Sequence, residues 1–177
     1  MIIYFLRHAS AGEPKLDSAS DEKRPLDKLG IKQSHDMGRV LAALDITVDA
    51  IISSPLLRAL QTAEMVAEEL GHEGKITTDA ALRPEGSYEM FRDLLRRHSS
   101  KKSIMVAGHN PSMTEFLNRL LSGGSSFNAI EMKKGAVAKV ETDDHDSALL
   151  KWYLPPKVAR ALQPASASSS RPKAVSK

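Results

Sequence analysis

The sequence contains no cysteine. This absence excludes disulfides, zinc–thiolate sites, iron–sulfur clusters and a thiol nucleophile. No apolar stretch approaches the roughly 20 residues that are needed to cross a bilayer. The first residues reach Arg7 too early, without a small-residue cleavage site, to form a secretory signal. We therefore expect a cytoplasmic enzyme or binding domain that has no membrane partner.

The chain also lacks a strongly basic body, although its net charge is +3 and its pI is about 9.1. Five basic residues and no acid lie after Leu154, so residues 1–154 are slightly acidic. A nucleic-acid-binding domain carries its positive charge on a folded face, so we expect no nucleic-acid partner. Residues 155–177 are rich in Pro, Ala and Ser, with few large apolar groups. We predict one domain over 1–154 and a disordered basic tail over 155–177, with at most a short helix at 157–162.

Apolar runs alternate with segments of helical period through the first 154 residues. The run at 2–6 is continuously apolar, which is typical of a strand buried on both faces. Further strands are predicted at 49–53, 75–78, 103–107, 136–141 and 148–153, and helices at 27–44, 55–70, 88–97 and 111–121. This alternation predicts an α/β three-layer sandwich with a mostly parallel central sheet.

Nearly twenty residues, 9–26, separate the first strand from the first helix and contain Gly12, Pro14, Pro25 and many charges. Loops of this length in compact domains are usually functional or disordered. This one leaves the carboxyl end of a strand, where open α/β sheets bind their ligands. We expect it to border the functional site.

Cationic and imidazole side chains follow three of the predicted strands. The first ends in Arg7 and His8, the helix after the second begins near Arg58, and a third is followed by His109. The carboxyl ends of parallel strands share one edge of a sheet, so these side chains are expected to meet. Guanidinium groups bind phosphoryl oxygens, and helix amino termini near Pro55 and Pro111 add backbone N–H donors.

Histidine adds a nucleophile to this pocket. A neutral imidazole can attack phosphorus and form a covalent intermediate that water then opens. Nearby arginines disfavour the imidazolium, so His8 is expected to be the free base at neutral pH. His109, with Arg7 and Arg58, is expected to stabilise the charge on the phosphoryl oxygens.

Three segments carry a resemblance to the histidine phosphatase superfamily, which contains the cofactor-dependent phosphoglycerate mutases. They are residues 7–9 (RHA), 53–63 (SSPLLRALQTA) and 108–112 (GHNPS), in the family's order. With Arg24-Pro25-Leu26, Gly30 and the short chain, the sequence is most similar to the SixA-type phosphohistidine phosphatases. The resemblance implies a phosphoglycerate mutase-like fold with one antiparallel strand among parallel ones. It also implies that His8 becomes phosphorylated, that Arg7, Arg58 and His109 complete the phosphate pocket, and that no metal or cofactor is required.

Three further residues have two interpretations each. Mutase-like members of the superfamily supply a carboxylic acid that protonates an alkoxide leaving group, and Glu85 lies in about the right region; otherwise it is a surface carboxylate. Ser54 either ends a strand as a helix cap or contacts phosphate directly. Asn110 either caps the next helix or contacts substrate. Ala9 stands where the wider superfamily most often has glycine.

Four functions remain open from the sequence. The first is dephosphorylation of phosphohistidine on a signalling protein, such as a histidine-containing phosphotransfer domain, because the body has no room for long inserts over the pocket. The second is hydrolysis of a small phosphate ester with Glu85 as the acid. The third is a catalytically silent module that binds phosphate or a phosphoprotein. A metal hydrolase using His8 and His109 is the weakest, because no HxH or HExxH pattern is present.

Overall fold

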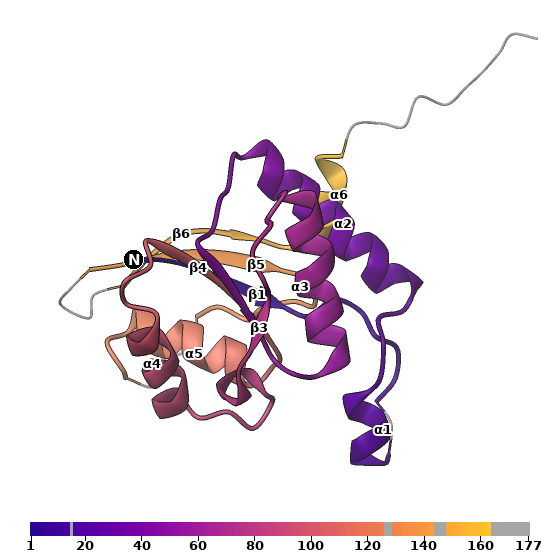
Figure 1. The fold of residues 1–177 in the computed structure, drawn as a ribbon, viewed down its shortest axis with the longest axis horizontal. Helices are drawn as coiled ribbons and strands as arrows, with labels where there is room; N and C mark the ends of the chain where they lie inside the picture. The colour runs from indigo at the N-terminus through magenta and orange to yellow at the C-terminus, as the bar shows by residue number, and fades with distance from the viewer. Residues whose placement is uncertain (15, 126–128, 144–147, 164–177) are drawn as a thin grey trace, which may run out of the picture.

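A computed structural model describes residues 1–14, 16–125, 129–143 and 148–163, and it contains one six-stranded sheet in the order β3-β2-β4-β1-β5-β6 (Figure 1). Strands β1 to β4 run parallel to one another, and β5 runs antiparallel to both β1 and β6. The predicted mostly parallel sheet is confirmed, including the single antiparallel strand. The strand bounds are β1 Ile2–Arg7, β2 Ala50–Ser53, β3 Thr77–Thr78, β4 Ser103–Gly108, β5 Val137–Thr142 and β6 Ala148–Leu154.

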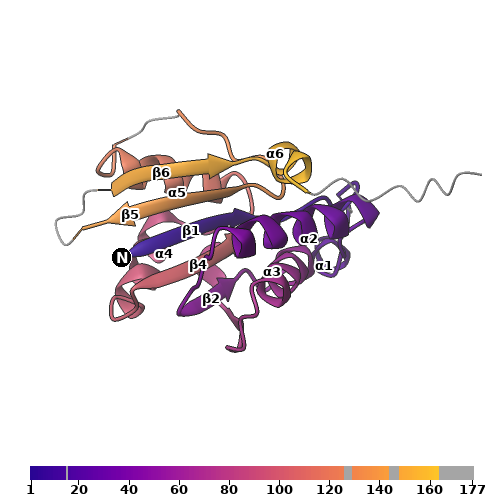
Figure 2. The same cartoon turned by 90° about the horizontal axis from the view of Figure 1, so that it is seen from above.

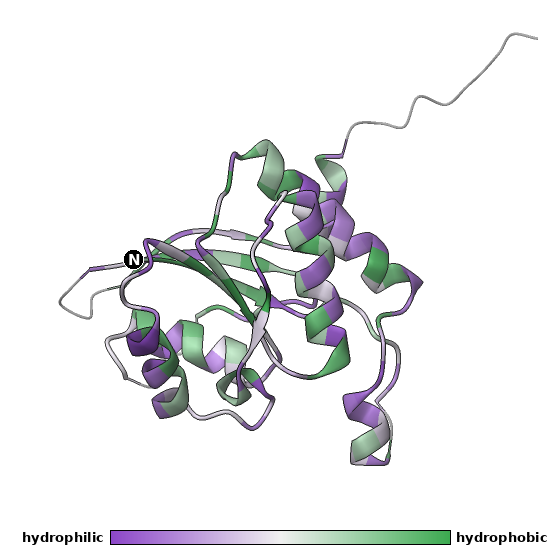
Figure 3. Cartoon of the chain, in the orientation of Figure 1, coloured by the Kyte–Doolittle hydropathy of each residue, from purple (hydrophilic) through white to green (hydrophobic). Residues whose placement is uncertain are grey.

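Strand β1 lies in the middle of the sheet and is buried on both faces, as its continuous apolar run predicts. Ile3 and Phe5 face one helical layer, and Tyr4 and Leu6 face the other. The first layer contains α4 and α5, and the second contains α2, α3 and α6 (Figure 2). Hydropathy follows the same division, because the strands are largely apolar and the outer helical surfaces are polar (Figure 3). The helix bounds are α2 Lys28–Ala43, α3 Leu57–Glu69, α4 Tyr88–Arg97, α5 Ser112–Leu121 and α6 Pro156–Ala161.

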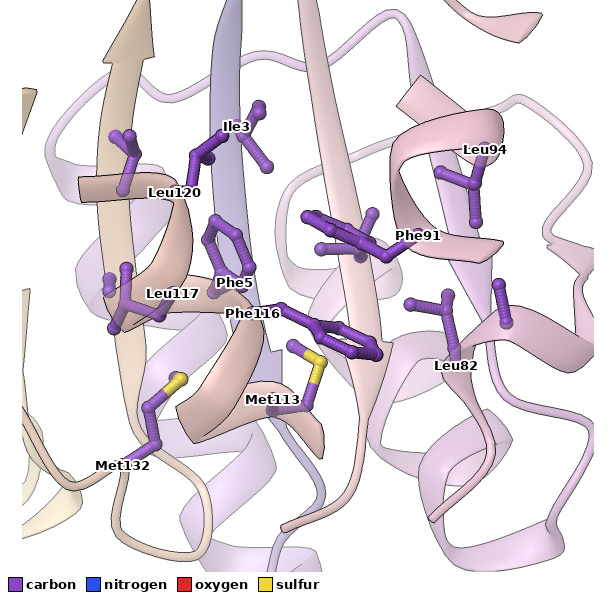
Figure 4. Close-up of a cluster of buried hydrophobic side chains, with 14 of the residues drawn as sticks. Ile3, Phe5, Leu82, Phe91, Leu94, Met113, Phe116, Leu117, Leu120 and Met132 are labelled. Atoms are coloured by element: carbon purple, nitrogen blue, oxygen red, sulfur yellow. The ribbon is translucent and has the colours of Figure 1, made fainter. Parts of the chain in front are cut away.

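Aromatic side chains fasten α4 and α5 to the sheet (Figure 4). The rings of Phe91 and Phe116 stack with centroids 4.8 Å apart, and Phe5 lies 5.5 Å from Phe91. All three side chains are fully buried. Burying a large apolar side chain contributes about 1.5–3 kcal/mol, so this cluster fixes the position of α5, which follows directly after His109.

The structure differs from the sequence-based expectation within the long loop and in α4. Residues 9–26 contain a short helix, α1 Ser18–Glu22, and a 3₁₀ helix, η1 Ala80–Leu82, precedes α4. Met90 of α4, an apolar residue in a predicted helix, is 41% exposed. Because α1 buries none of its residues, no apolar period in the sequence could reveal it.

Helix α6 lies beyond the domain boundary predicted at residue 154. Its Ala159 is fully buried against α2, and Gln163 donates a hydrogen bond to the carbonyl of Asp36 at 2.9 Å. Folded structure therefore extends to Gln163, and the rest of the predicted tail, 164–177, lies outside the described residues. None of the helices within the described ranges is long and apolar enough to cross a membrane.

Candidate active site

His8 is held at the carboxyl end of β1 in a defined orientation. Its backbone N–H donates to the carbonyl of Gly108 at 2.9 Å, and its ring Nδ1 lies 2.7 Å from the carbonyl oxygen of Ala9. A carbonyl oxygen only accepts, so the proton must be on Nδ1. The other nitrogen, Nε2, therefore carries the lone pair that a nucleophile needs.

The ring of His109 lies next to that of His8, with centroids 4.9 Å apart. His109 follows β4, which pairs directly with β1. Its Nε2 is 2.8 Å from the hydroxyl oxygen of Ser54. When Ser54 donates to Nε2, the imidazole carries its proton on Nδ1, and that N–H becomes available to an acceptor in the pocket.

The two predicted arginines are anchored by protein oxygens. Arg7 donates from Nη1 to the carbonyl of Met132 at 2.7 Å. Arg58 donates from Nη1 to the carbonyl of Asp21 at 2.9 Å, and the same nitrogen lies 3.2 Å from Oδ2 of Asp21. Thr62 links this arginine to the loop after His8, because its hydroxyl donates to the Arg58 carbonyl and accepts from the backbone of Ala9.

Three buried nitrogens of the predicted site residues have no hydrogen-bond partner among the described residues: Nε of Arg7, Nε of Arg58 and Nδ1 of His109. Only one other buried side-chain atom in the described ranges shares this condition, Nε2 of His72. Leaving a buried donor unpaired costs about 1–3 kcal/mol, so native proteins seldom keep several together without a ligand to receive them. Two guanidinium groups and an imidazole N–H that act on the same buried histidine suit a tetrahedral oxyanion.

Burial is the main cause that lowers the pKa of both imidazoles. It takes the pKa of His8 down to about 3, helped by the charges of Arg58, Arg7 and Lys134, although the hydrogen bond to Ala9 opposes the change. The pKa of His109 falls to about 2, again by burial first and then by the charges of His8 and the arginines. Both rings are therefore neutral at pH 7, as expected for His8 from its arginine neighbours.

Ser54 and Asn110 hold other groups of the site in place. Ser54 is fully buried; its hydroxyl lies against His109 and accepts from the backbone of Leu56 at 3.3 Å. Asn110 donates to the carbonyl of Met132 and accepts from Thr114. Neither side chain caps the following helix, so that interpretation is wrong: α3 begins after Leu56 and α5 after Pro111, both without a side-chain cap. Direct contact of either residue with phosphate stays a prediction.

Glu85 is linked to the site through Arg83, whose charge acts on His109. Its side chain is 65% exposed, and its Oε1 accepts from Nε of Arg83 at 2.5 Å. This hydrogen bond lowers the pKa of Glu85, so the carboxyl is ionised at neutral pH and carries no proton to donate. The general acid role predicted for Glu85 remains a prediction, and its observed surroundings oppose it.

The structure adds residues to which sequence reasoning assigned no role. Asp21 of α1 contacts Arg58, and Arg24 holds Asp21 through an ion pair of 2.7 Å. Arg83 also forms an ion pair with Glu22 of α1, and its charge acts on His109. Only Arg24 had a signal in the sequence, as part of the Arg-Pro-Leu motif of the resemblance. Within the described ranges, no cluster of three His, Asp or Glu side chains is arranged to hold a metal ion.

Comparisons with known proteins identify the family of this chain. The family described as histidine phosphatase superfamily (branch 1) matches residues 3–88. An uncharacterized protein from Picosynechococcus is 32% identical over 168 residues, which cover 88% of this chain and all of that protein. Phosphohistidine phosphatase SixA of Escherichia coli K12 is 27% identical over 167 residues, covering 92% of this chain and all of SixA.

A solved structure of the protein histidine phosphatase SixA complexed with tungstate superimposes with a TM-score of 0.78 at 26% identity. The alignment covers 89% of this chain and 98% of the other. Fold, site and sequence thus define a phosphoryl-handling hydrolase of the phosphoglycerate mutase-like class. The chain belongs to branch 1 of the histidine phosphatase superfamily and is SixA-like within it.

Proposed function

We propose that the protein is a metal-independent phosphatase that removes the phosphoryl group from phosphohistidine on another protein, through a covalent intermediate on His8. The observation that carries this proposal is the tautomer of His8. The Ala9 carbonyl holds the ring proton on Nδ1 and so leaves the lone pair on Nε2, in a ring that lies 4.9 Å from the ring of His109 and feels the charges of Arg58 and Arg7. Tungstate, which the SixA structure contains, is a tetrahedral oxyanion like phosphate, and this supports the assignment of the pocket.

In the first step the Nε2 lone pair of His8 forms a bond to phosphorus as the bond from phosphorus to the substrate imidazole breaks. That imidazole keeps the bonding pair and leaves as a neutral molecule, its other ring nitrogen having taken a proton from solvent. Arg7, Arg58 and His109 donate to the phosphoryl oxygens as charge spreads over them. The Ala9 carbonyl accepts from the Nδ1–H of the phosphorylated His8 ring, which is cationic.

In the second step a water molecule adds to phosphorus and the bond to His8 breaks. The electron pair returns to Nε2, inorganic phosphate leaves, and one proton of the water passes to solvent. A phosphoenzyme of this kind divides one displacement into two easier ones.

Phosphohistidine fits this site better than a phosphate ester because of the leaving group. An imidazole is a much weaker base than an alkoxide and needs less help from an acid. Glu85, the acid predicted for an ester, is held ionised by Arg83. The SixA likeness supports the same substrate.

The test compares a phosphohistidine peptide with an alkyl phosphate, each in the presence of a chelator. Wild type is expected to hydrolyse the peptide, and His8→Ala to lose turnover, while His98→Ala serves as a control that removes an imidazole elsewhere. Rapid quenching should trap acid-labile phosphate that maps to His8 by mass spectrometry. Turnover by His8→Ala would overturn the covalent mechanism. A large loss in Glu85→Gln on the ester alone would assign an acid role to Glu85 and favour an ester substrate.

A further inference from the structure

Helix α1 brings two carboxylates to the arginines of the pocket. Asp21 lies against Arg58, whose Nη1 is bonded to the Asp21 carbonyl and is 3.2 Å from its Oδ2. The next residue, Glu22, forms an ion pair with Arg83, whose charge reaches His109. Helix α1 therefore places two carboxylates beside arginines of the candidate phosphate site.

Asp21 is fixed in this position. Arg24 holds Oδ1 of Asp21 at 2.7 Å, and Arg24 is itself buried, with Nη1 bonded to the carbonyls of Ala11 and Gly12. The side chain of Asp21 is 22% exposed, so its charge is only partly screened by water. The fixed negative charge of Asp21 therefore attracts cationic groups and repels anionic groups of a substrate bound next to Arg58.

The charges of the residues around the candidate phosphate site do not cancel once phosphate is bound. A phosphoryl dianion neutralises Arg7 and Arg58, and the pair of Arg83 with Glu85 adds no net charge. Segment 9–26 then holds four acidic residues (Glu13, Asp17, Asp21 and Glu22) against three basic ones (Lys15, Lys23 and Arg24). The exposed Lys134 is a separate cation, outside segment 9–26, whose charge acts on His8. The α1 side is therefore negative toward whatever carries the phosphoryl group.

We infer that Asp21 and Glu22 determine specificity by selecting phosphoryl groups carried beside basic side chains and rejecting those carried beside acidic ones. This inference rests on the proposed function, because it names the class of phosphohistidine protein that the site takes. A substrate carboxylate next to the phosphoryl group would meet the carboxylate of Asp21 at short range, whereas a substrate lysine would be attracted to it.

The experiment uses two phosphohistidine peptides that are identical except that the residues flanking the histidine are Lys in one and Glu in the other. The measured quantity is the ratio of kcat/KM for the Lys peptide to kcat/KM for the Glu peptide. We expect a ratio of about ten or more in wild type at low salt, which shrinks as salt screens the charges. Asp21→Asn and Glu22→Gln should each reduce the ratio, and Lys134→Gln should raise it.

Glu68→Gln is the matched control, since it removes one exposed carboxylate from α3 away from the pocket and should leave the ratio unchanged. A ratio is also insensitive to a general loss of activity caused by a shift of Arg58. If wild type hydrolyses both peptides and Asp21→Asn and Glu22→Gln leave the ratio unaltered, the inference is wrong and the proposed function stands.

Hydrolysis of neither peptide would instead remove the proposed function. The inference about charge selectivity is then tested by comparing the hydrolysis rates of two aryl phosphates with matched leaving groups. One ester bears a remote carboxylate and the other a remote trimethylammonium group. A preference for the cationic ester that Asp21→Asn diminishes supports the inference, and equal rates on the two esters overturn it.

Discussion

Ser54 is a residue whose effect on catalysis should pass entirely through another side chain. Its hydroxyl lies 2.8 Å from Nε2 of His109, which orients the ring and leaves the Nδ1 proton for the pocket. We predict that Ser54→Ala lowers kcat about tenfold, less than the 10²–10³ typical of removing an oxyanion donor itself. Ser53→Ala is the control, because it removes a neighbouring buried hydroxyl that is bonded to the Ser54 carbonyl and not to His109.

A double-mutant cycle separates this positioning role from a structural one. In a His109→Ala background, Ser54→Ala should cause no further loss of kcat, because the ring that it orients is gone. Equal losses in both backgrounds would contradict the role assigned to Ser54.

The pKa of His8 makes the stability of the protein sensitive to acid. The pKa is about 3 in the folded state and about 6.5 in an unfolded chain, so below pH 6.5 the unfolded state binds a proton that the folded state refuses. Stability is therefore lost as the pH falls from about 6.5 towards 3. Between pH 7 and pH 5 wild type should lose about 2 kcal/mol more of its free energy of unfolding than His8→Gln does. Denaturant unfolding at the two pH values measures this, and equal losses would show that His8 is not held neutral.

Among the elements, the first turn of α2 packs tightly against the loop that follows His8. A Cβ on Gly30 would lie 1.9 Å from the carbonyl oxygen of Ser10, which already accepts from the backbone of Asp27. Gly→Ala inside a helix usually stabilises by about 1 kcal/mol. Here we predict the opposite sign, a loss of about 2–3 kcal/mol from overpacking. Leu29→Ala, at an adjacent position that is 53% exposed, should change stability by less than about 0.5 kcal/mol in denaturant unfolding. A stabilised Gly30→Ala would refute the close approach.

Elements with their own apolar period or cap were predictable from the sequence, and those held by polar contacts were not. Asp27 is a favourable capping residue at the start of the helix predicted at 27–44, and its Oδ1 accepts from the backbone of Gly30 at 2.7 Å. Helix α1 has no buried residue; it depends on the cap at Asp17 and on the pairing of its acids with Arg58 and Arg83. Such long-range ion pairs leave no periodic trace in a sequence.

At the scale of the whole molecule, the convergence of the site followed from topology. Parallel strands end at one edge, so Arg7, His8 and His109 had to meet once the sheet was predicted, and Arg58 followed from the helix after β2. The partners that position them come from segments whose place in the fold the sequence does not indicate, namely Met132 before β5 and Asp21 in α1. The sequence-based prediction ended the domain at residue 154 because residues 155–177 are rich in Pro, Ala and Ser. The short helix α6 has too few apolar residues for its sequence to indicate a packed face.

Helix α6 nevertheless closes the sheet face that carries α2, and its contribution can be measured with one pair of substitutions. Ala159 is fully buried, whereas Val158, one residue earlier, is 44% exposed. Ala159→Glu would bury a carboxylate in the apolar cluster that contains Leu6 of β1 and Leu41 of α2. We therefore predict a loss of at least about 2 kcal/mol in the free energy of unfolding. Val158→Glu adds the same charge to the same helix at an exposed position and should cost less than about 0.5 kcal/mol. If both variants unfold at the same denaturant concentration as wild type, α6 does not belong to the folded domain, and the boundary at residue 154 that composition predicts is the correct one.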